Sequence, residues 1–180
     1  KYDEQGRRIR RIERDYDDHI SQSTEYLYDD RGNLAEFAKC DNTDGEVLMK
    51  EIYQYDSDGE LAVMEHYGYN GVLQVKFSRD KIVEEGKTLM RHTTYHYFDD
   101  GSIFMLKHSV YDDNRLLREE SYVDDALTNR DVYEYDAEQR VIRLTSLSYG
   151  RELTCERLYR YDNDGRRVEM IKKGGDGSLK

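Results

Sequence analysis

The chain has 180 residues, of which 37% are hydrophobic and 37% charged, and its formal net charge is −11 at pH 7. This apolar content argues against a thick two-layer core, and the acidic balance argues against nucleic-acid binding, which needs clustered Lys and Arg. Disorder is disfavoured because the chain has 17 Tyr and no Pro. The length predicts a single domain covering residues 1–180.

One motif, Tyr-x-Tyr-Asp-x-x-Gly-x-Leu, recurs along the chain and sets the order of the predicted elements. Half a copy opens the sequence at Tyr2, and the copies then cover residues 26–34, 53–61, 95–103, 133–141 and 159–168. Turns recur about every 11 to 15 residues, close to the spacing of short strands joined by turns. The weaker turn signals between the copies are Asp17-Asp18, Asn42–Gly45, Asn70-Gly71, Glu85-Gly86, Asp113-Asn114, Asp124-Asp125, Tyr149-Gly150 and Asp176-Gly177.

The segments between these turns alternate as β-strands do. In Val47–Tyr55 every second residue is large and mostly apolar, whereas Lys50 and Gln54 fall on the other side. The least regular stretch, Asp80–Lys87, is expected to hold a short helical or irregular turn. The pattern predicts an all-β fold, an antiparallel meander of roughly 12 to 13 short strands.

A meander of this size is too wide to stay flat, because open twisted sheets of that width tend to curl or split. We therefore expect an elongated, coiled and partly single-layer sheet, with a closed up-and-down barrel as the alternative. The edges of an open sheet carry unpaired backbone groups, so such a sheet can also self-associate edge to edge.

Each motif contains a local reason for the chain to turn. The Asp after the second Tyr accepts backbone N–H groups, and the Gly three residues later takes the positive φ of a type I turn with a bulge. The apolar residue beyond the Gly then faces the tyrosines, as Leu34 would face Tyr28. The copy at Tyr133 has Gln139 in place of Gly, which predicts a turn of different type or length. The residues assigned to structural turns are Asp29, Gly32, Asp56, Gly59, Gly101, Asp162 and Gly165.

The chain resembles the YD repeats of RHS-type proteins. The resemblance is carried by Tyr26–Leu34, Tyr53–Leu61 and Tyr159–Gly165, and by Asp162–Arg167, which is close to the Asp-x-x-Gly-Arg of that family. It implies a spiral of strand-turn-strand units on large secreted or surface-exposed bacterial proteins, forming a shell around a toxin segment or an adhesive, carbohydrate-binding surface. A chain of 180 residues is too short for a closed shell. A non-catalytic structural or adhesive module of a secreted or cell-surface protein is therefore the leading prediction.

The tyrosines are the candidate surface for holding a glycan or a protein partner. Exposed rings stack on sugars, whereas the alternative is that the same rings form the sheet's own packing. The second hypothesis is an acidic, immunity-like intracellular (cytoplasmic) module whose charge steers a basic partner. The candidate binding residues are Tyr26, Tyr28, Tyr53, Tyr55, Tyr95, Tyr97, Tyr133, Tyr135, Tyr159 and Tyr161.

Catalytic motifs do not occur in the sequence, and metal motifs are incomplete. Without a nucleophile elbow, a phosphate loop or a zinc-protease motif, we expect no enzyme activity and no cofactor. A pairing of Tyr97 with Ile103 would place His92 opposite His108, with His96 on the same face, which makes a weak zinc candidate. The Asp-x-Asp-Gly turns lack the other ligands of a calcium loop.

Two further features of the sequence concern the cellular compartment of the protein. Cys40 and Cys155 match no metal-binding spacing, and both a disulfide and two free thiols agree with the sequence. No segment approaches 18 consecutive apolar residues, so no membrane span is expected.

Overall fold

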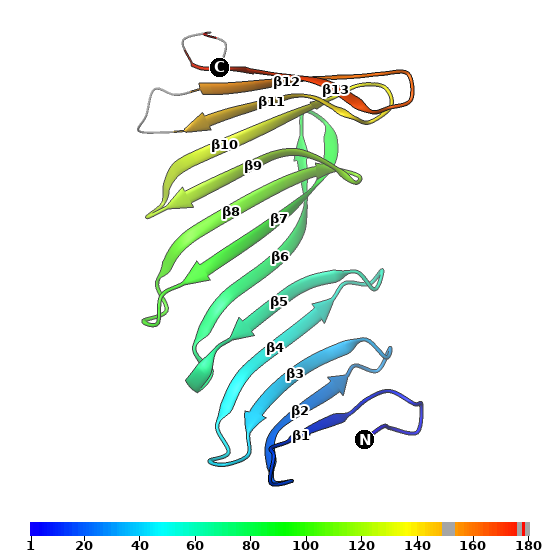
Figure 1. The fold of residues 1–180 in the computed structure, drawn as a ribbon, viewed down its shortest axis with the longest axis vertical. Coiled ribbons are helices and arrows are strands. Elements are labelled where there is room, and N and C mark those ends of the chain that lie inside the picture. The colour runs from blue at the N-terminus through cyan, green and yellow to red at the C-terminus, as the bar shows by residue number, and fades with distance from the viewer. Residues whose placement is uncertain (149–153, 176–177, 179–180) are drawn as a thin grey trace. The chain divides into compact units, whose positions relative to one another are not determined.

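The structure, a computed structural model, describes residues 1–148, 154–175 and 178. These residues form strands that follow one another in the sheet in chain order, each hydrogen-bonded to the next (Figure 1). The elements are β1 (Arg10–Arg14), β2 (Ile20–Tyr28), β3 (Leu34–Asp41), β4 (Val47–Tyr55), β5 (Leu61–Tyr67), the 3-10 turn η1 (Tyr69–Gly71), β6 (Leu73–Glu84), β7 (Lys87–Tyr97), β8 (Ile103–Asp112), β9 (Arg115–Val123), β10 (Ala126–Tyr135), β11 (Val141–Ser148), β12 (Thr154–Tyr161) and β13 (Arg167–Lys173).

The predicted all-β antiparallel meander is confirmed, with 13 strands in a single sheet. The alternative of an up-and-down barrel is wrong, because the strand order begins at β1 and ends at β13 without pairing these two strands. The predicted turns at Tyr149-Gly150 and Asp176-Gly177 lie outside the described residues.

Contacts along the backbone divide the chain into two compact units, which are described separately below. Unit 1 comprises Lys1–Arg79 and Thr94–Ile103, and unit 2 comprises Asp80–Thr93 and Phe104–Lys180. Strands β6, β7 and β8 contribute residues to both units. That residues 1–180 act as one domain stays a prediction.

A one-residue bulge follows the turn in the motif hairpins closed by Tyr28, Tyr55, Tyr135 and Tyr161. In unit 1, Tyr28 pairs with Leu34 as expected, but the preceding residue, Leu27, pairs with Glu36, so Ala35 is extra. The same register shift occurs in unit 2, where Tyr135 pairs with Val141. The shift adds local twist to the strand and moves every later pair by one position.

The turn at Gln139 corrects the sequence-based expectation. Gln139 adopts a positive φ of 65°, and its N–H donates to the Asp136 carbonyl at 3.1 Å, as Gly32 does to Asp29 at 3.0 Å. The prediction of a different turn is therefore wrong: type and length are unchanged. The bonds from Arg140 to Asp136, including its N–H at 2.8 Å and Nε at 2.7 Å, hold the turn in spite of the missing glycine.

The stretch Asp80–Lys87 is also more regular than expected. Residues up to Glu84 continue strand β6, and Lys87 begins β7. The two residues between them, Glu85 and Gly86, have φ values of 50° and 77°. Two consecutive positive φ values are typical of the tight type I′ hairpin turn, so the expected short helical or irregular turn is wrong.

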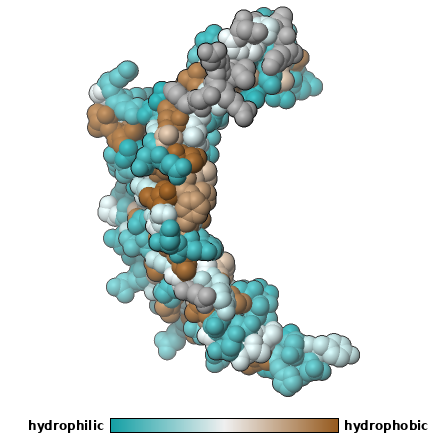
Figure 2. Space-filling view, turned by 90° about the vertical axis from the view of Figure 1, so that its left-hand side faces the viewer, coloured by the Kyte–Doolittle hydropathy of each residue, from teal (hydrophilic) through white to brown (hydrophobic). Residues whose placement is uncertain are grey.

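Very little of the described chain is a conventional hydrophobic core. Its buried hydrophobic residues are Leu89 and Val110, both in unit 2. Hydrophobic and hydrophilic residues are intermixed on the side seen in Figure 2. Every described strand belongs to one sheet, and side chains shield one another along the strands. Among the described residues, no helix has the length and apolar character needed to cross a membrane.

Candidate functional site

Aspartate carboxylates bind the backbone N–H groups of the turns. The Oδ1 atom of Asp29 accepts the N–H groups of Arg31 at 3.0 Å and Asn33 at 2.7 Å. Equivalent pairs of bonds reach the carboxylates of Asp3, Asp15, Asp56 and Asp162. These carboxylate oxygens hold the loop's own backbone, which accounts for the Asp in the motif.

In the two Asp-x-Asp-Gly turns the first aspartate, Asp56 or Asp162, therefore accepts N–H groups of its own turn. Within the described part of the chain, no group of three or more His, Cys, Asp or Glu side chains is arranged to hold a metal ion.

The second tyrosine of the motif links neighbouring turns. In unit 1, the Tyr28 hydroxyl donates to the carbonyl of Arg8 at 2.9 Å, and the Tyr55 hydroxyl donates to the carbonyl of Leu34 at 3.0 Å. Each acceptor lies two residues beyond the Gly of the preceding motif turn. We call these bonds tyrosine latches.

Unit 2 repeats this arrangement. The Tyr135 hydroxyl donates to the carbonyl of Leu116 at 2.8 Å, and the Tyr161 hydroxyl donates to the carbonyl of Val141 at 2.9 Å. In all four latches the donor and the acceptor are separated by 19 to 21 positions in sequence. The latches therefore tie one hairpin to the hairpin before it, a contact between neighbouring repeats.

Arginines reinforce two of these latches. The guanidinium carbon of Arg7 lies 4.5 Å from the ring centroid of Tyr28, and that of Arg140 lies 4.9 Å from the ring centroid of Tyr161. Both arginines follow the positive-φ residue of the preceding turn. Cations over aromatic rings at this distance are attracted by the ring's electron density.

The first tyrosine of the motif has a different surrounding in each copy. The Tyr26 ring meets the Phe37 ring edge to face at 5.6 Å. Burial, and then negative charge on Glu119, raises the pKa of Tyr133 to about 12. The Arg167 guanidinium lies 5.7 Å from the Tyr159 ring centroid.

The hydroxyl of Tyr53 donates to Glu51, whose other carboxylate oxygen lies 3.1 Å from Nδ1 of His66. Burial, and then this bond to Glu51, raises the pKa of Tyr53. The sequence reasoning missed this cluster. The pairing of Tyr55 with Leu61, followed by the one-residue bulge, places Glu51 opposite His66 and would have revealed it.

All ten candidate tyrosines are half-buried, but they do not gather in one patch. In unit 1, Tyr26 pairs with Phe37, and Phe37 with Glu51, which places Tyr26 and Tyr53 on one face. The rings of Tyr95 and Tyr97 stack on each other at 6.4 Å. In unit 2, Tyr133 pairs with Leu144, which pairs with Arg157, so Tyr133 and Tyr159 share a face.

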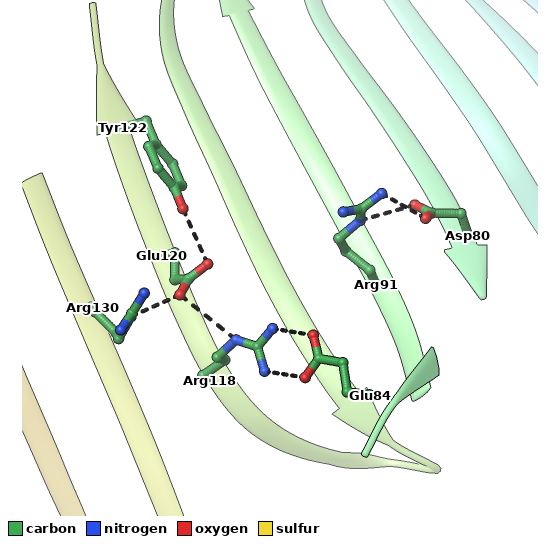
Figure 3. A network of polar contacts seen from close by, with 7 residues as sticks. All are labelled: Asp80, Glu84, Arg91, Arg118, Glu120, Tyr122 and Arg130. Atoms are coloured by element: carbon green, nitrogen blue, oxygen red, sulfur yellow. Dashed lines mark hydrogen bonds and ion pairs between the residues drawn. The ribbon is translucent and has the colours of Figure 1, made fainter. Parts of the chain in front are cut away.

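The face of unit 2 opposite to that of Tyr133 and Tyr159 carries a network of ion pairs (Figure 3). Arg118 binds Glu84 with two bonds of 2.7 and 2.6 Å, and the bond from Arg118 holds the pKa of Glu84 below its usual range. The buried Glu120 lies 2.7 Å from Nε of Arg130 and accepts the Tyr122 hydroxyl at 3.2 Å. Every carboxylate of this network is matched by a guanidinium group, since Arg91 also holds Asp80 at 2.8 Å. The carboxylate and guanidinium groups of the network therefore neutralise one another.

The three histidines are placed differently from the zinc hypothesis. In unit 2, Nδ1 of His108 lies 3.0 Å from the Thr93 hydroxyl, and the His92 ring lies 4.6 Å from the Tyr111 ring. Burial, and then the charge of Arg91, lowers the pKa of His108. His96 belongs to unit 1.

The cysteines are half-buried free thiols, Cys40 in unit 1 and Cys155 in unit 2.

Comparison with known proteins gives only distant structural likenesses. No protein-family model matches the chain, and no curated protein matches it. A chain of the Photorhabdus luminescens Tc holotoxin pore is similar at 14% identity with a TM-score of 0.34, covering 96% of this chain and 11% of that one. A chain in the crystal structure of TcdB2-TccC3-TEV is similar at 12% identity with a TM-score of 0.33, covering 100% of this chain and 14% of that one. The protein thus spans about an eighth of the length of either.

Proposed function

We propose that this protein is a non-catalytic structural module of stacked hairpins, part of a secreted or cell-surface bacterial protein. The observation that carries the proposal is the tyrosine latch, which uses a motif residue to join four of the hairpins to the one before each. A tyrosine whose hydroxyl is already bonded to a backbone carbonyl has a structural role rather than a catalytic one. The self-neutralised ion pairs of unit 2 further support a structural role.

Such a module would present the uncovered faces of its sheet to a glycan or to a protein. Four of the second tyrosines contribute their hydroxyls to the latches, and we take the first tyrosines as the rings for stacking on sugars. We expect sugar binding to depend on Tyr133 or Tyr159 in unit 2, which share a face.

A glycan array probed with the whole chain at low and high salt tests this role. Stacking on sugars should survive high salt and should be lost in Tyr159→Ala, whereas Tyr16→Ala, at a fully exposed turn position, serves as the matched control. Absence of any glycan or protein binding, together with latch variants of unchanged stability, would reject the module.

A second candidate function, an acidic protein-interaction module, is favoured by the distribution of charge. Most described Lys and Arg side chains are held in ion pairs, whereas many acidic side chains at turn tips have no ionic partner within the described residues. This unpaired negative charge would steer a basic partner. Binding of that kind should weaken steeply as salt is raised, unlike binding to sugars. The turn-tip residues are Asp17, Asp30, Asp58, Glu85, Asp113, Asp124 and Asp125.

A further inference from the structure

A groove of about 500 Å³ lies on unit 1, beside strand β4. Ile52, the stem of Lys50, Val47 and the ring of Tyr67 line it, with Gly71 of η1 at its side. Its volume falls in the range of ligand-binding clefts, and its lining is mostly apolar.

The walls of the groove are held in place by specific bonds. On one side, the N–H of Glu46 donates to Asp44 at 3.0 Å, and its carbonyl accepts the N–H of Asp41 at 2.9 Å. On the other side, the N–H of Gly68 donates to the carbonyl of Val72 at 2.9 Å. A Cβ atom at Gly68 would lie 2.3 Å from the side-chain amide of Gln74, so a larger residue at this position would displace the Gln74 side chain.

The polar groups around the groove leave one charge uncompensated. Lys50 is neutralised by Glu36, at 2.8 Å. The Tyr67 hydroxyl donates to Glu65 at 2.8 Å, and Glu65 also accepts Lys76, at 2.8 Å. The exposed carboxylate of Glu46 has no hydrogen-bond or ionic partner within the described residues. The groove therefore combines apolar walls with a single free negative charge.

We propose that this groove binds the Lys or Arg side chain of a basic protein partner. The long aliphatic stem of such a side chain would cover Val47 and Ile52, and its cation would reach the Glu46 carboxylate. Charge complementarity favours this occupant, since a neutral ligand would leave Glu46 unmatched and an anion would be repelled by it. The inference rests on the second proposed function and assigns it a site.

The probe for this site is the tripeptide acetyl-Leu-Arg-Leu-amide, added to the isotope-labelled whole chain and followed by amide chemical shifts. We expect shifts centred on Val47, Lys50, Ile52 and Gly71. The variant Glu46→Gln should weaken binding about fivefold, as expected for one exposed ion pair. The control Glu4→Gln makes the same substitution at an exposed turn of unit 1 and should leave the affinity unchanged. Replacing Arg by citrulline in the peptide should weaken binding as much as Glu46→Gln does.

A second variant tests the apolar wall. Val47→Thr keeps the shape of the side chain but adds a hydroxyl to the lining, and we expect weaker binding with an unchanged spectrum of the free protein. Equal loss in Glu46→Gln and Glu4→Gln, or shifts that avoid the groove, would overturn the site.

An octa-arginine probe separates the groove from the wider function. If octa-arginine binds in a salt-dependent manner while the tripeptide does not perturb the groove, the groove is rejected and the acidic module stands. If neither probe binds, both proposals fail.

Discussion

At the scale of single residues, three motif positions have an identifiable structural role. The aspartate holds the loop's own N–H groups, the glycine supplies the positive φ, and the second tyrosine reaches a carbonyl of the preceding hairpin. The first two roles are local and could be predicted from sequence, because the partners lie within four residues. The latch could not, since Tyr28 and Arg8 are 20 positions apart and meet only through strand pairing.

Loss of a latch should lower stability. We expect Tyr135→Phe to decrease the free energy of unfolding by about 1 kcal/mol, because the Leu116 carbonyl loses its hydroxyl donor while the ring stays in place. Urea unfolding followed by circular dichroism measures the change. Tyr16→Phe, at a fully exposed side chain, should leave the midpoint unaltered. Equal midpoints for both variants would show that the latch contributes nothing.

Gln139 should be a destabilising exception in the row of motif turns. It adopts a φ of 65°, a conformation that costs a side-chain-bearing residue about 1 kcal/mol and glycine almost nothing. We expect Gln139→Gly to raise the free energy of unfolding by up to about 1 kcal/mol. The reciprocal change, Gly165→Gln at the equivalent position of the last motif, should lower it by a similar amount. Urea midpoints of the two variants should therefore move in opposite directions.

At the scale of elements, strands and turns were readable from the sequence, but the exact register was not. The period of two and the Asp-to-Gly turns predict each hairpin. The bulge after each turn then shifts the pairing by one residue, and a shift of one residue moves a side chain to the opposite face. For this reason the Glu51–His66 pair was missed.

The link between strands made by Glu84 and Arg118 should depend on pH. Hydrogen bonds from Arg118 hold the pKa of Glu84 below its usual 4.5. A carboxylate with a lowered pKa in the folded state stabilises the fold above its unfolded pKa, and this contribution is lost as the pH falls through the folded pKa. Since both side chains are partly exposed, solvent screening limits the effect to about 1 kcal/mol.

The variant Glu84→Gln isolates this contribution from the general repulsion among acidic groups. We expect it to be less stable than the parent at pH 7, with the difference shrinking below about pH 4.5 and vanishing once Glu84 is protonated in the parent. Urea midpoints of the two proteins across this range give the comparison. A difference that persists at the lowest pH would assign the loss to packing rather than to charge.

At the scale of the whole chain, stability rests on hydrogen-bonded ladders, latches and ion pairs more than on apolar burial. Only Leu89 and Val110 are buried hydrophobic residues among those described. The composition anticipated this, because a chain with 37% charged residues cannot fill a thick core. What composition could not indicate is which polar side chains pair with one another, as when Arg118 donates two hydrogen bonds to Glu84.

Unfolding should therefore carry a small heat-capacity change. Exposure of apolar surface raises the heat capacity, and exposure of polar surface lowers it, so a sheet with few buried apolar side chains gains little. A globular chain of 180 residues would show about 2.2 to 2.7 kcal/mol/K. We expect a value clearly below that range, measured as the slope of the unfolding enthalpy against Tm in scanning calorimetry. A value within the range would mean that the chain buries apolar surface to the extent of an ordinary globular core, for example by association of two copies. Sedimentation at the same concentrations would detect that association.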